Sequence, residues 1–270
     1  MKISVIIPTY KPREYLWESL DSLCRQTFSK SDFEILLVLN GCDEPYKSAI
    51  VDYTTLHPEL NLHLIHTQTS GVSNARNLAL DEMKGEYYMC LDDDDCLSPV
   101  CLEEMYELAN EDTVVECYPY GFNDGSPEVQ QKYGLTDAYD YCVANNCNKL
   151  NSSARKFFSG PCMKLIPVSY VGDRRFNTRF RNGEDSIFMF LISDRIKNIA
   201  YTSRNAIYYR RFREGSAVSR KRTKSERIKN CILCIVEYSK IFLSGKYSIY
   251  FYMTRIFAEI KCMIKVMRDR

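Results

Sequence analysis

Strands and helices alternate along the first third of the chain, and this alternation limits the possible folds more than any other feature. Short apolar runs predict strands at residues 3–7, 33–39, 62–65 and 87–91. Apolar residues at helical spacing predict helices at residues 13–26, 45–54 and 73–83. Because helical crossovers join parallel strands, the pattern predicts an α/β fold with a mostly parallel central sheet and helices on both faces.

The rest of the chain has weaker patterns. The expected elements are a helix from residue 99, strands at 114–118, 164–166 and 200–201, and an apolar helix at 186–192. Residues 121–156 contain Gly, Asn, Asp and Tyr without clear periodicity, which predicts a largely polar, irregular excursion. A length of 270 residues suits one principal domain.

Four consecutive aspartates, Asp92 to Asp95, directly follow the strand at 87–91. Their like charges repel at the end of a buried strand, so they need a cation, and divalent metals that prefer oxygen ligands fit. The alternative is a solvated acidic turn that caps the next helix. Because ligands bind beyond the carboxyl ends of parallel strands, the turns at 8–10 and 40–41 should lie beside the run, which favours the metal site.

The end of the chain is predicted to be helical, with a heptad-like apolar stripe. The stripe consists of Ile249, Met253, Ile256, Ile260, Met263 and Met267. Three interpretations compete: packing on the domain, self-association, and contact with an anionic membrane surface. Packing is the commonest fate of such a helix, whereas basic residues elsewhere on it keep the membrane interpretation open.

Charge and cysteine content narrow the setting. A net charge of +1 argues against a nucleic-acid-binding protein. Twelve scattered cysteines and the lack of a secretory signal favour free thiols in a reducing cytosol. Cys231 and Cys234 are expected to pack in a core, and His57, His63 and His66 show no ligand pattern and are expected to be structural. No transmembrane span is expected.

Five motifs in order resemble the inverting glycosyltransferases of family 2. They are Val5–Tyr10, Gly71–Asn77, Gly85–Tyr87, Leu91–Asp95 and Gly183–Asp185. The resemblance covers roughly residues 3–216. It implies a GT-A fold, which is Rossmann-like, and a nucleotide-activated sugar as donor, with a C-terminal helical extension beyond the fold.

The resemblance implies nucleotide contacts at the ends of the first strands. Pro8, Thr9 and Tyr10 match the loop that contacts the nucleotide base, and Asn40 lies where the family commonly has an Asp or Asn beside the base. Gly71 begins the segment that closes over the base and the diphosphate.

The resemblance also implies roles for Arg76 and the acidic run. Arg76 belongs to the closing segment; its alternative is a solvated arginine on an exposed helix face. Asp92 and Asp94 match the two acids of the DxD motif, so Asp92 would approach the ribose and Asp94 would bind Mn²⁺ or Mg²⁺. Asp93 is assigned to the nucleotide site, and Asp95 would assist at the metal.

The catalytic assignment also comes from the resemblance. Asp185 matches the general base and Glu184 the residue that orients the acceptor, whereas Arg211 and Arg213 match a basic loop over the pyrophosphate. One displacement with one base would invert the anomeric carbon. The alternative for Asp185 is a carboxylate that merely stabilises a helix N-terminus.

The function that the resemblance implies is transfer of a hexose or N-acetylhexosamine from a UDP-sugar to a hydroxyl of a glycan or lipid-linked acceptor, in surface polysaccharide synthesis. Residues 1–120 would bind the nucleotide-sugar, 121–216 the acceptor, and 217–270 would form amphipathic helices. We expect a cytoplasmic protein, peripheral at the inner face of the membrane. The alternatives are a sugar-phosphate nucleotidyltransferase, which should have a Gly-rich loop after the first strand, and an inactive membrane-surface scaffold.

Overall fold

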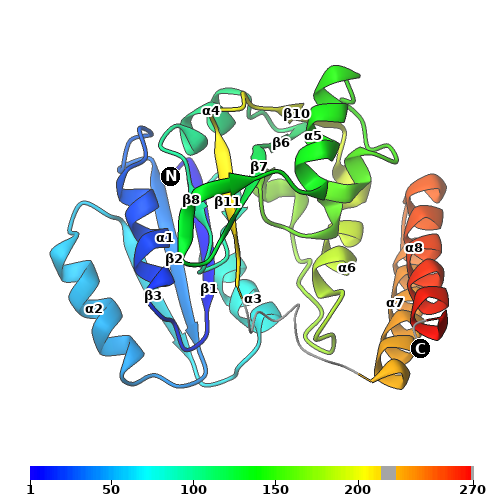
Figure 1. Cartoon of the computed structure of the whole chain (residues 1–270), viewed down its shortest axis with the longest axis horizontal. Coiled ribbons are helices and arrows are strands. Elements are labelled where there is room, and N and C mark those ends of the chain that lie inside the picture. Colours follow the sequence, from blue (N-terminus) through cyan, green and yellow to red (C-terminus); the bar gives the residue numbers. More distant parts are fainter. Residues whose placement is uncertain (214–222, 269–270) are drawn as a thin grey trace.

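A seven-stranded sheet forms the centre of the computed structural model, which describes residues 1–213 and 223–268 (Figure 1). The strands lie in the order β3-β2-β1-β4-β9-β6-β10. Their bounds are β1 (Ile3–Thr9), β2 (Phe33–Asn40), β3 (Leu62–Thr67), β4 (Tyr87–Cys90), β6 (Thr113–Glu116), β9 (Lys164–Pro167) and β10 (Asn198–Tyr201). Only β9 runs antiparallel to its neighbours, so the predicted mostly parallel sheet is confirmed.

Alternate residues of the strands face two separate apolar cores. On one face, Val5 and Ile7 of β1 pack with α1 (Tyr15–Cys24), α2 (Tyr46–Leu56) and α4 (Cys101–Glu107). On the other face, Ile6 packs in the core that includes residues of α3 (Val72–Glu82) and α6 (Glu184–Leu191). Side chains of a strand alternate between faces, so a fully buried run such as β1 requires helices on both sides.

A second, four-stranded sheet corrects the prediction of a single strand at 114–118. It consists of β5 (Cys96–Leu97), β11 (Ile207–Phe212), β7 (Tyr118–Asn123) and β8 (Ser126–Gln131). The single strand expected at 114–118 is in fact divided at Cys117 between β6 and β7, which belong to different sheets.

The prediction of an irregular excursion at 121–156 is also wrong. The segment holds the end of β7, all of β8, helix α5 (Gly134–Ala144) and the start of the 3-10 helix η1 (Ala154–Ser159). The buried face of α5 is built from Thr136, Ala138, Tyr139 and Cys142, small or partly polar residues that hide its helical period. Two further 3-10 turns are η2 (Val168–Tyr170) and η3 (Ser193–Arg195).

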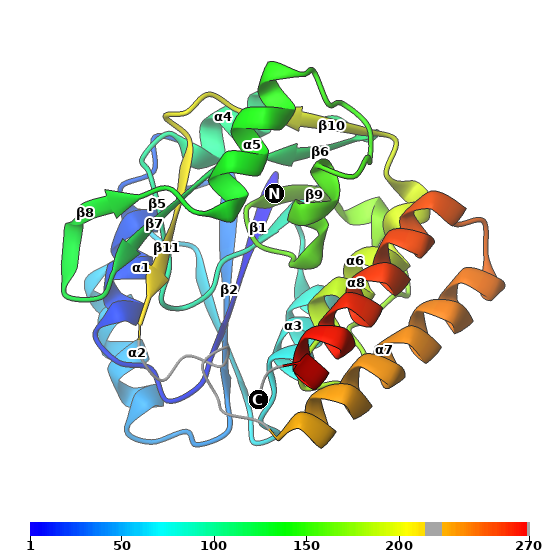
Figure 2. The ribbon, with the colours of Figure 1, turned by 45° about the vertical axis from the view of Figure 1, so that its right-hand side comes forward.

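The C-terminal segment forms two antiparallel helices, α7 (Lys224–Ser244) and α8 (Ile249–Arg268), which lie side by side outside α6 (Figures 1 and 2). Phe190 of α6 contacts Tyr238, Tyr247 and Phe251. The pair thus packs on the domain, but the buried face of α8 contains Phe251, Arg255 and Val266 rather than the predicted stripe. Among the described residues, no helix is both long enough and apolar enough to cross a membrane.

Candidate active site

Two loops meet at the carboxyl ends of β1 and β2 through Asn40. The Asn40 amide nitrogen donates to the Thr9 carbonyl (2.6 Å), and the Gly71 amide donates to the Asn40 side-chain oxygen (2.9 Å). Asn40 is 3% exposed, so its side chain serves to join the loops. Pro8, opposite Val38 in the sheet, is also buried.

Tyr10 presents an aromatic ring at this edge and is 51% exposed. Its ring lies over Gly41, where a Cβ atom would come within 2.7 Å of the ring and where φ is +99°. Only glycine tolerates both the contact and the positive φ. The turn after β2 therefore leaves an open aromatic face next to the loops that Asn40 joins.

Arg76 of α3 links the acidic run to α6. Its guanidinium donates to Asp185 (Nη1–Oδ1, 2.6 Å) and to Asp92 (Nη2–Oδ1, 3.1 Å). The side chain is 3% exposed and lies over the ring of Phe176, 5.4 Å from its centroid. Asn77 fixes Phe176 by two hydrogen bonds to its backbone. The interpretation of Arg76 as a solvated surface arginine is therefore wrong.

Asp93 and Asp94 have different partners within the acidic run. Thr9 Oγ1 donates to Asp93 Oδ2 (2.5 Å), and Arg213 Nε donates to Asp94 Oδ2 (2.5 Å). Burial raises the pKa of Asp93 to about 7, although the Thr9 hydrogen bond opposes this. Burial and the charge of Asp92 also raise the pKa of Asp94. Burial therefore disfavours the ionised forms of both carboxyls, and the negative charges of neighbouring aspartates add to the effect.

A divalent cation fits this charge distribution. The donors at the run are carboxylate oxygens, which Mg²⁺ and Mn²⁺ prefer. Asp92 has a 45% exposed side chain, and that of Asp94 is 16% exposed. These two residues would hold the cation, whose charge would relieve the repulsion that raises the pKa of Asp94.

Asp95 faces inward, toward β11. Tyr208 donates its hydroxyl to Asp95 Oδ2 (2.7 Å), and the Arg211 amide donates to Asp95 Oδ1 (2.8 Å). The same Tyr208 hydroxyl accepts from the Asp92 amide (3.2 Å). Tyr208 thus fixes both ends of the run. Tyr208 was not among the predicted site residues. The strand-favouring residues that begin at Ile207 could have indicated a strand there.

Arg211 is held by two carboxylates and one backbone carbonyl, from three segments. Its guanidinium donates to Glu18 of α1 (2.5 Å), to Asp124 (2.8 Å) and to the Asp94 carbonyl (2.9 Å). The side chain is 4% exposed. Arg213, at 22% exposed, is the more accessible of the two predicted pyrophosphate ligands. Residues 214–216 of the predicted basic loop lie outside the described residues.

Glu184 and Asp185 form the first turn of α6. Gly183 precedes them with φ of +85°, which sets the angle at which the helix begins. Glu184 is buried, whereas the Asp185 side chain is 31% exposed. Burial raises the pKa of Asp185 even though Arg76 opposes the shift. A carboxylate with a raised pKa is a stronger base while still ionised near neutral pH.

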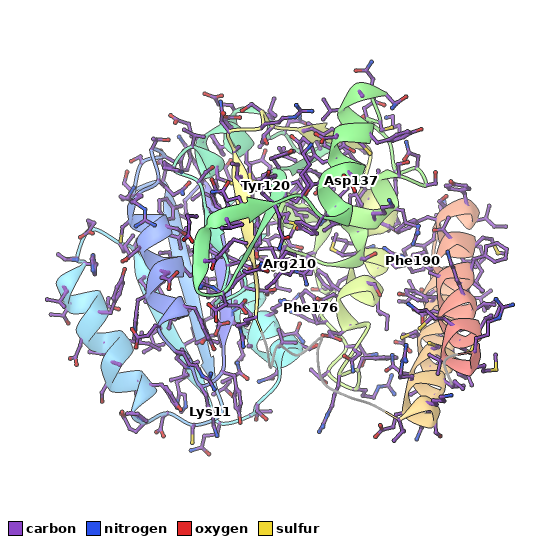
Figure 3. The ribbon with its side chains drawn as sticks, viewed as in Figure 1. Lys11, Tyr120, Asp137, Phe176, Phe190 and Arg210 are labelled. Carbon is purple, nitrogen blue, oxygen red and sulfur yellow. The ribbon has the colours of Figure 1, made fainter. Side chains whose placement is uncertain are left out.

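A basic cavity of about 350 Å³ lies next to β11. Its charged lining residues are Arg155, Lys156 and Arg210. Arg210 also lies over the rings of Tyr133 and Phe212, and Figure 3 places it near the middle of the molecule. Arg210 of the cavity lining directly precedes Arg211, whose backbone amide donates to Asp95. The cavity therefore shares a strand with the residues that contact the acidic run. It offers a binding place for an anionic group.

The raised pKa of Asp93 predicts a pH-dependent stability difference. A folded-state pKa of about 7, above the unfolded value, gives stability that is complete at low pH and lost as pH rises through 7. Asp93→Asn removes that loss. Without added metal, we expect Asp93→Asn to gain about 4 kcal/mol of unfolding free energy over wild type between pH 4 and pH 8, because the folded-state pKa lies about three pH units above the unfolded one.

Urea unfolding in the presence of a chelator measures this difference. Asp52→Asn, at an exposed position of α2, is the matched control for the aspartate-to-asparagine change itself. An Asp93→Asn advantage of equal size at both pH values would contradict the prediction.

The chain matches the family described as glycosyl transferase family 2 over residues 4–162. It is 28% identical over 221 residues to the poly(ribitol-phosphate) beta-N-acetylglucosaminyltransferase TarS of Staphylococcus aureus, covering 81% of this chain and 37% of TarS. Similarity to the glycosyltransferase GlyG of Streptococcus pneumoniae is 27% over 230 residues, with 79% and 72% covered. The chain spans only 23–37% of the length of the first four curated relatives it matches.

Solved structures support the fold. Residues 1–349 of S. aureus TarS in complex with UDP-GlcNAc superpose with a TM-score of 0.72 at 24% identity, over 98% of this chain and 73% of that one. The mannosyltransferase PcManGT of Pyrobaculum calidifontis, in complex with GDP-Man and Mn²⁺, gives 0.66 at 18%, over 98% and 73%. The predicted GT-A fold is confirmed. The family match covers more than half of the chain, so the chain belongs to glycosyl transferase family 2.

Proposed function

We propose that the chain is an inverting glycosyltransferase that moves a hexose or N-acetylhexosamine from a UDP-sugar to a hydroxyl of a glycan or lipid-linked acceptor, in surface polysaccharide synthesis. One observation carries the proposal. Arg76 holds Asp92, which would face the donor, and Asp185, which would serve as base, on a single buried guanidinium. The donor side and the acceptor side of a displacement reaction are thus joined by one residue.

Support for the donor comes from the relatives and from the sheet edge. TarS was solved in complex with UDP-GlcNAc, and the relatives' names include an N-acetylglucosaminyltransferase and a glucosyltransferase. In this chain, Tyr10 and the loops joined by Asn40 would receive the base, and Arg213 would lie over the diphosphate. Asp94, with Asp92, would hold Mn²⁺ or Mg²⁺, which when bound neutralises the charge that develops on the leaving diphosphate.

The chain's own residues perform the proton transfer. Asp185 accepts the proton of the acceptor hydroxyl as that oxygen bonds to the anomeric carbon. The bond from that carbon to the diphosphate oxygen breaks, and the nucleoside diphosphate leaves. Glu184 orients the acceptor. Because one displacement occurs with no covalent sugar-enzyme intermediate, the anomeric configuration inverts.

The basic cavity fits the acceptor in this proposal. Lipid-linked saccharides carry phosphate groups, and Arg155, Lys156 and Arg210 would bind such an anion next to the site. Residues 1–120 would then hold the nucleotide-sugar and residues 121–216 the acceptor. Residues 217–270 would form the membrane-facing part, of which 217–222 and 269–270 lie outside the described residues.

The acidic run supplies the test of the donor site. Calorimetric titration of UDP with Mn²⁺ should show binding that a chelator weakens by about tenfold or more, since charge neutralisation of a diphosphate is lost. Asp94→Asn should weaken it equally, while Asp52→Asn on α2 should not. If neither UDP nor any other nucleoside diphosphate binds the folded protein, that result contradicts the proposal and favours the scaffold alternative.

The nucleotidyltransferase alternative has less support. The loop after β1 reads Pro8-Thr9-Tyr10-Lys11-Pro12 and contains no glycine. It therefore lacks a glycine-rich turn whose backbone N–H groups could bind a triphosphate. Release of pyrophosphate from a nucleoside triphosphate and a sugar phosphate would restore this alternative.

The outer surface of α8 supports a peripheral contact with the membrane. An apolar stripe runs along its exposed side, consisting of Ile249, Tyr250, Met253, Phe257, Ile260, Ile264 and Met267. Phe257 is 61% exposed and Ile264 is 41% exposed. Lys261, Lys265 and Arg268 are exposed on the same helix and suit an anionic surface.

Sedimentation with vesicles of mixed neutral and anionic lipid tests this contact. The double variant Phe257→Gln, Ile264→Gln should have a vesicle partition coefficient more than about tenfold lower, because two apolar side chains that would insert into the membrane are lost. Leu56→Gln, at a 76% exposed position of α2, is the control and should sediment as wild type does. Equal sedimentation of all three proteins would rule out the stripe as the contact.

A further inference from the structure

Three side chains with different donor atoms converge at the ends of α1 and α2. Cys24 is the last residue of α1, His57 follows α2, and Glu59 lies two residues further on. Cys24 Sγ is 3.7 Å from His57 Nδ1, and His57 Nδ1 is 3.3 Å from Glu59 Oε1. The three ligand atoms all lie within 4.8 Å of one another.

These separations match the edges of a zinc tetrahedron. Zinc binds sulfur at about 2.3 Å and nitrogen or oxygen at about 2.0–2.2 Å, so tetrahedral angles place sulfur and nitrogen about 3.5 Å apart and nitrogen and oxygen about 3.3 Å apart. The observed distances are 3.7 Å and 3.3 Å, so only small side-chain movements would bring the ligand atoms to these separations.

The surrounding aromatic residues hold the imidazole in place. Tyr53 stacks on His57 with ring centroids 4.3 Å apart. Trp17 in turn stacks on Tyr53, with ring centroids 5.1 Å apart. Tyr53 also donates its hydroxyl to Asp21 (2.7 Å) and lies 3.7 Å from Cys24 Sγ. Ligands held by packing and by outer hydrogen bonds lose little conformational entropy when a metal binds.

We infer that Cys24, His57 and Glu59 form a binding site for a thiophilic divalent cation, Zn²⁺, that ties α1 to α2. A thiolate, an imidazole and a carboxylate are zinc ligands, whereas Mg²⁺ and Mn²⁺ favour all-oxygen sites such as the acidic run. Binding releases the thiol proton to solvent, and water completes the coordination, since the Glu59 side chain is 49% exposed and that of His57 is 32% exposed.

The site is separate from the active site. In a parallel sheet each crossover helix runs back toward the amino ends of the strands, so the ends of α1 and α2 lie at the edge opposite Asp92 and Asp185. His57 was expected from the sequence to be purely structural, and the inference gives it a role as a metal ligand. The sequence did not indicate this because Cys24 is 33 positions away in the chain and only the fold brings the two together.

Cobalt titration of the full chain tests the site. Co²⁺ bound by a cysteine gives a sulfur-to-cobalt charge-transfer band in the near ultraviolet, and the all-oxygen site gives none. We expect the band to correspond to one Co²⁺ per chain and to disappear when Zn²⁺ displaces it. Saturating Zn²⁺ should also raise the thermal midpoint by about 5 °C.

Matched variants make the result decisive. Cys24→Ser should abolish the band, and Cys42→Ser, at an exposed cysteine, should retain it. Glu59→Gln, at an exposed position, should keep the band and lower the affinity about tenfold or more, which covers the case in which Cys24→Ser fails to fold. Absence of a band in wild type, or its persistence in Cys24→Ser, would overturn the inference. Neither result depends on whether UDP binds.

Discussion

Asp185→Asn is expected to lower the rate of sugar transfer by about 10²- to 10⁴-fold, which is the usual contribution of a positioned general base. Asparagine has nearly the same shape and keeps an oxygen for the Arg76 hydrogen bond, which measures 2.6 Å in wild type. UDP binding by calorimetry should therefore change by less than about threefold. The loss would appear in kcat, because the base acts only when the acceptor attacks.

The pH dependence gives a second measure of the same role. Because burial raises the pKa of Asp185, the acidic limb of the wild-type rate profile should lie above the usual range of an aspartate, and the rate should fall as pH drops through it. Asp52→Asn on α2 is the control for an aspartate-to-asparagine change and should retain full activity. Full transfer by Asp185→Asn would remove Asp185 as the base.

Arg76→Met is expected to lower the free energy of unfolding by about 3 kcal/mol and to abolish transfer. The change leaves the Asp92 and Asp185 carboxylates without their shared partner, and a partly buried charge that loses its counterion costs several kcal/mol. Arg175→Met is the matched control. Arg175 makes an equally short ion pair with Asp81 (2.6 Å), but both side chains are about a third or more exposed, so its loss should cost less than about 1 kcal/mol.

A double-mutant cycle separates the charge pair from other effects of Arg76. Combining Arg76→Met with Asp185→Asn neutralises both members, so the double variant should be more stable than the sum of the two single changes by about 1–2 kcal/mol. Urea unfolding of the four proteins provides the four values. Strictly additive changes would mean that the 2.6 Å contact contributes nothing to stability.

Sequence reasoning located the first half of the sheet because its strands are continuous apolar runs that end in turn residues. β1 and β2 are buried along their whole length, so their hydrophobic pattern is simple. The turns after them were expected to meet the acidic run, and Thr9 does bond to Asp93. Local patterns suffice where each strand is followed directly by the residues it positions.

The second sheet was harder to predict because its strands are partly exposed and carry charge. β11 contains Arg210 and Arg211, and only the fold shows that Arg211 reaches Glu18 in α1. The bridge made by Arg76 joins Asp92 to Asp185, which lies far along the chain on another helix. No local pattern contains such information, so the resemblance supplied the separate roles while the structure supplied the link.

The closure of the acidic run by β11 has a consequence for how the protein is made. Asp95 bonds to Tyr208 and to the Arg211 amide, across 113 and 116 positions of sequence. During synthesis the run leaves the ribosome long before its partners exist. Asp95 therefore gains these two hydrogen bonds only after β11 has been made and has docked, so the surroundings of the acidic run are among the last parts of the domain to form.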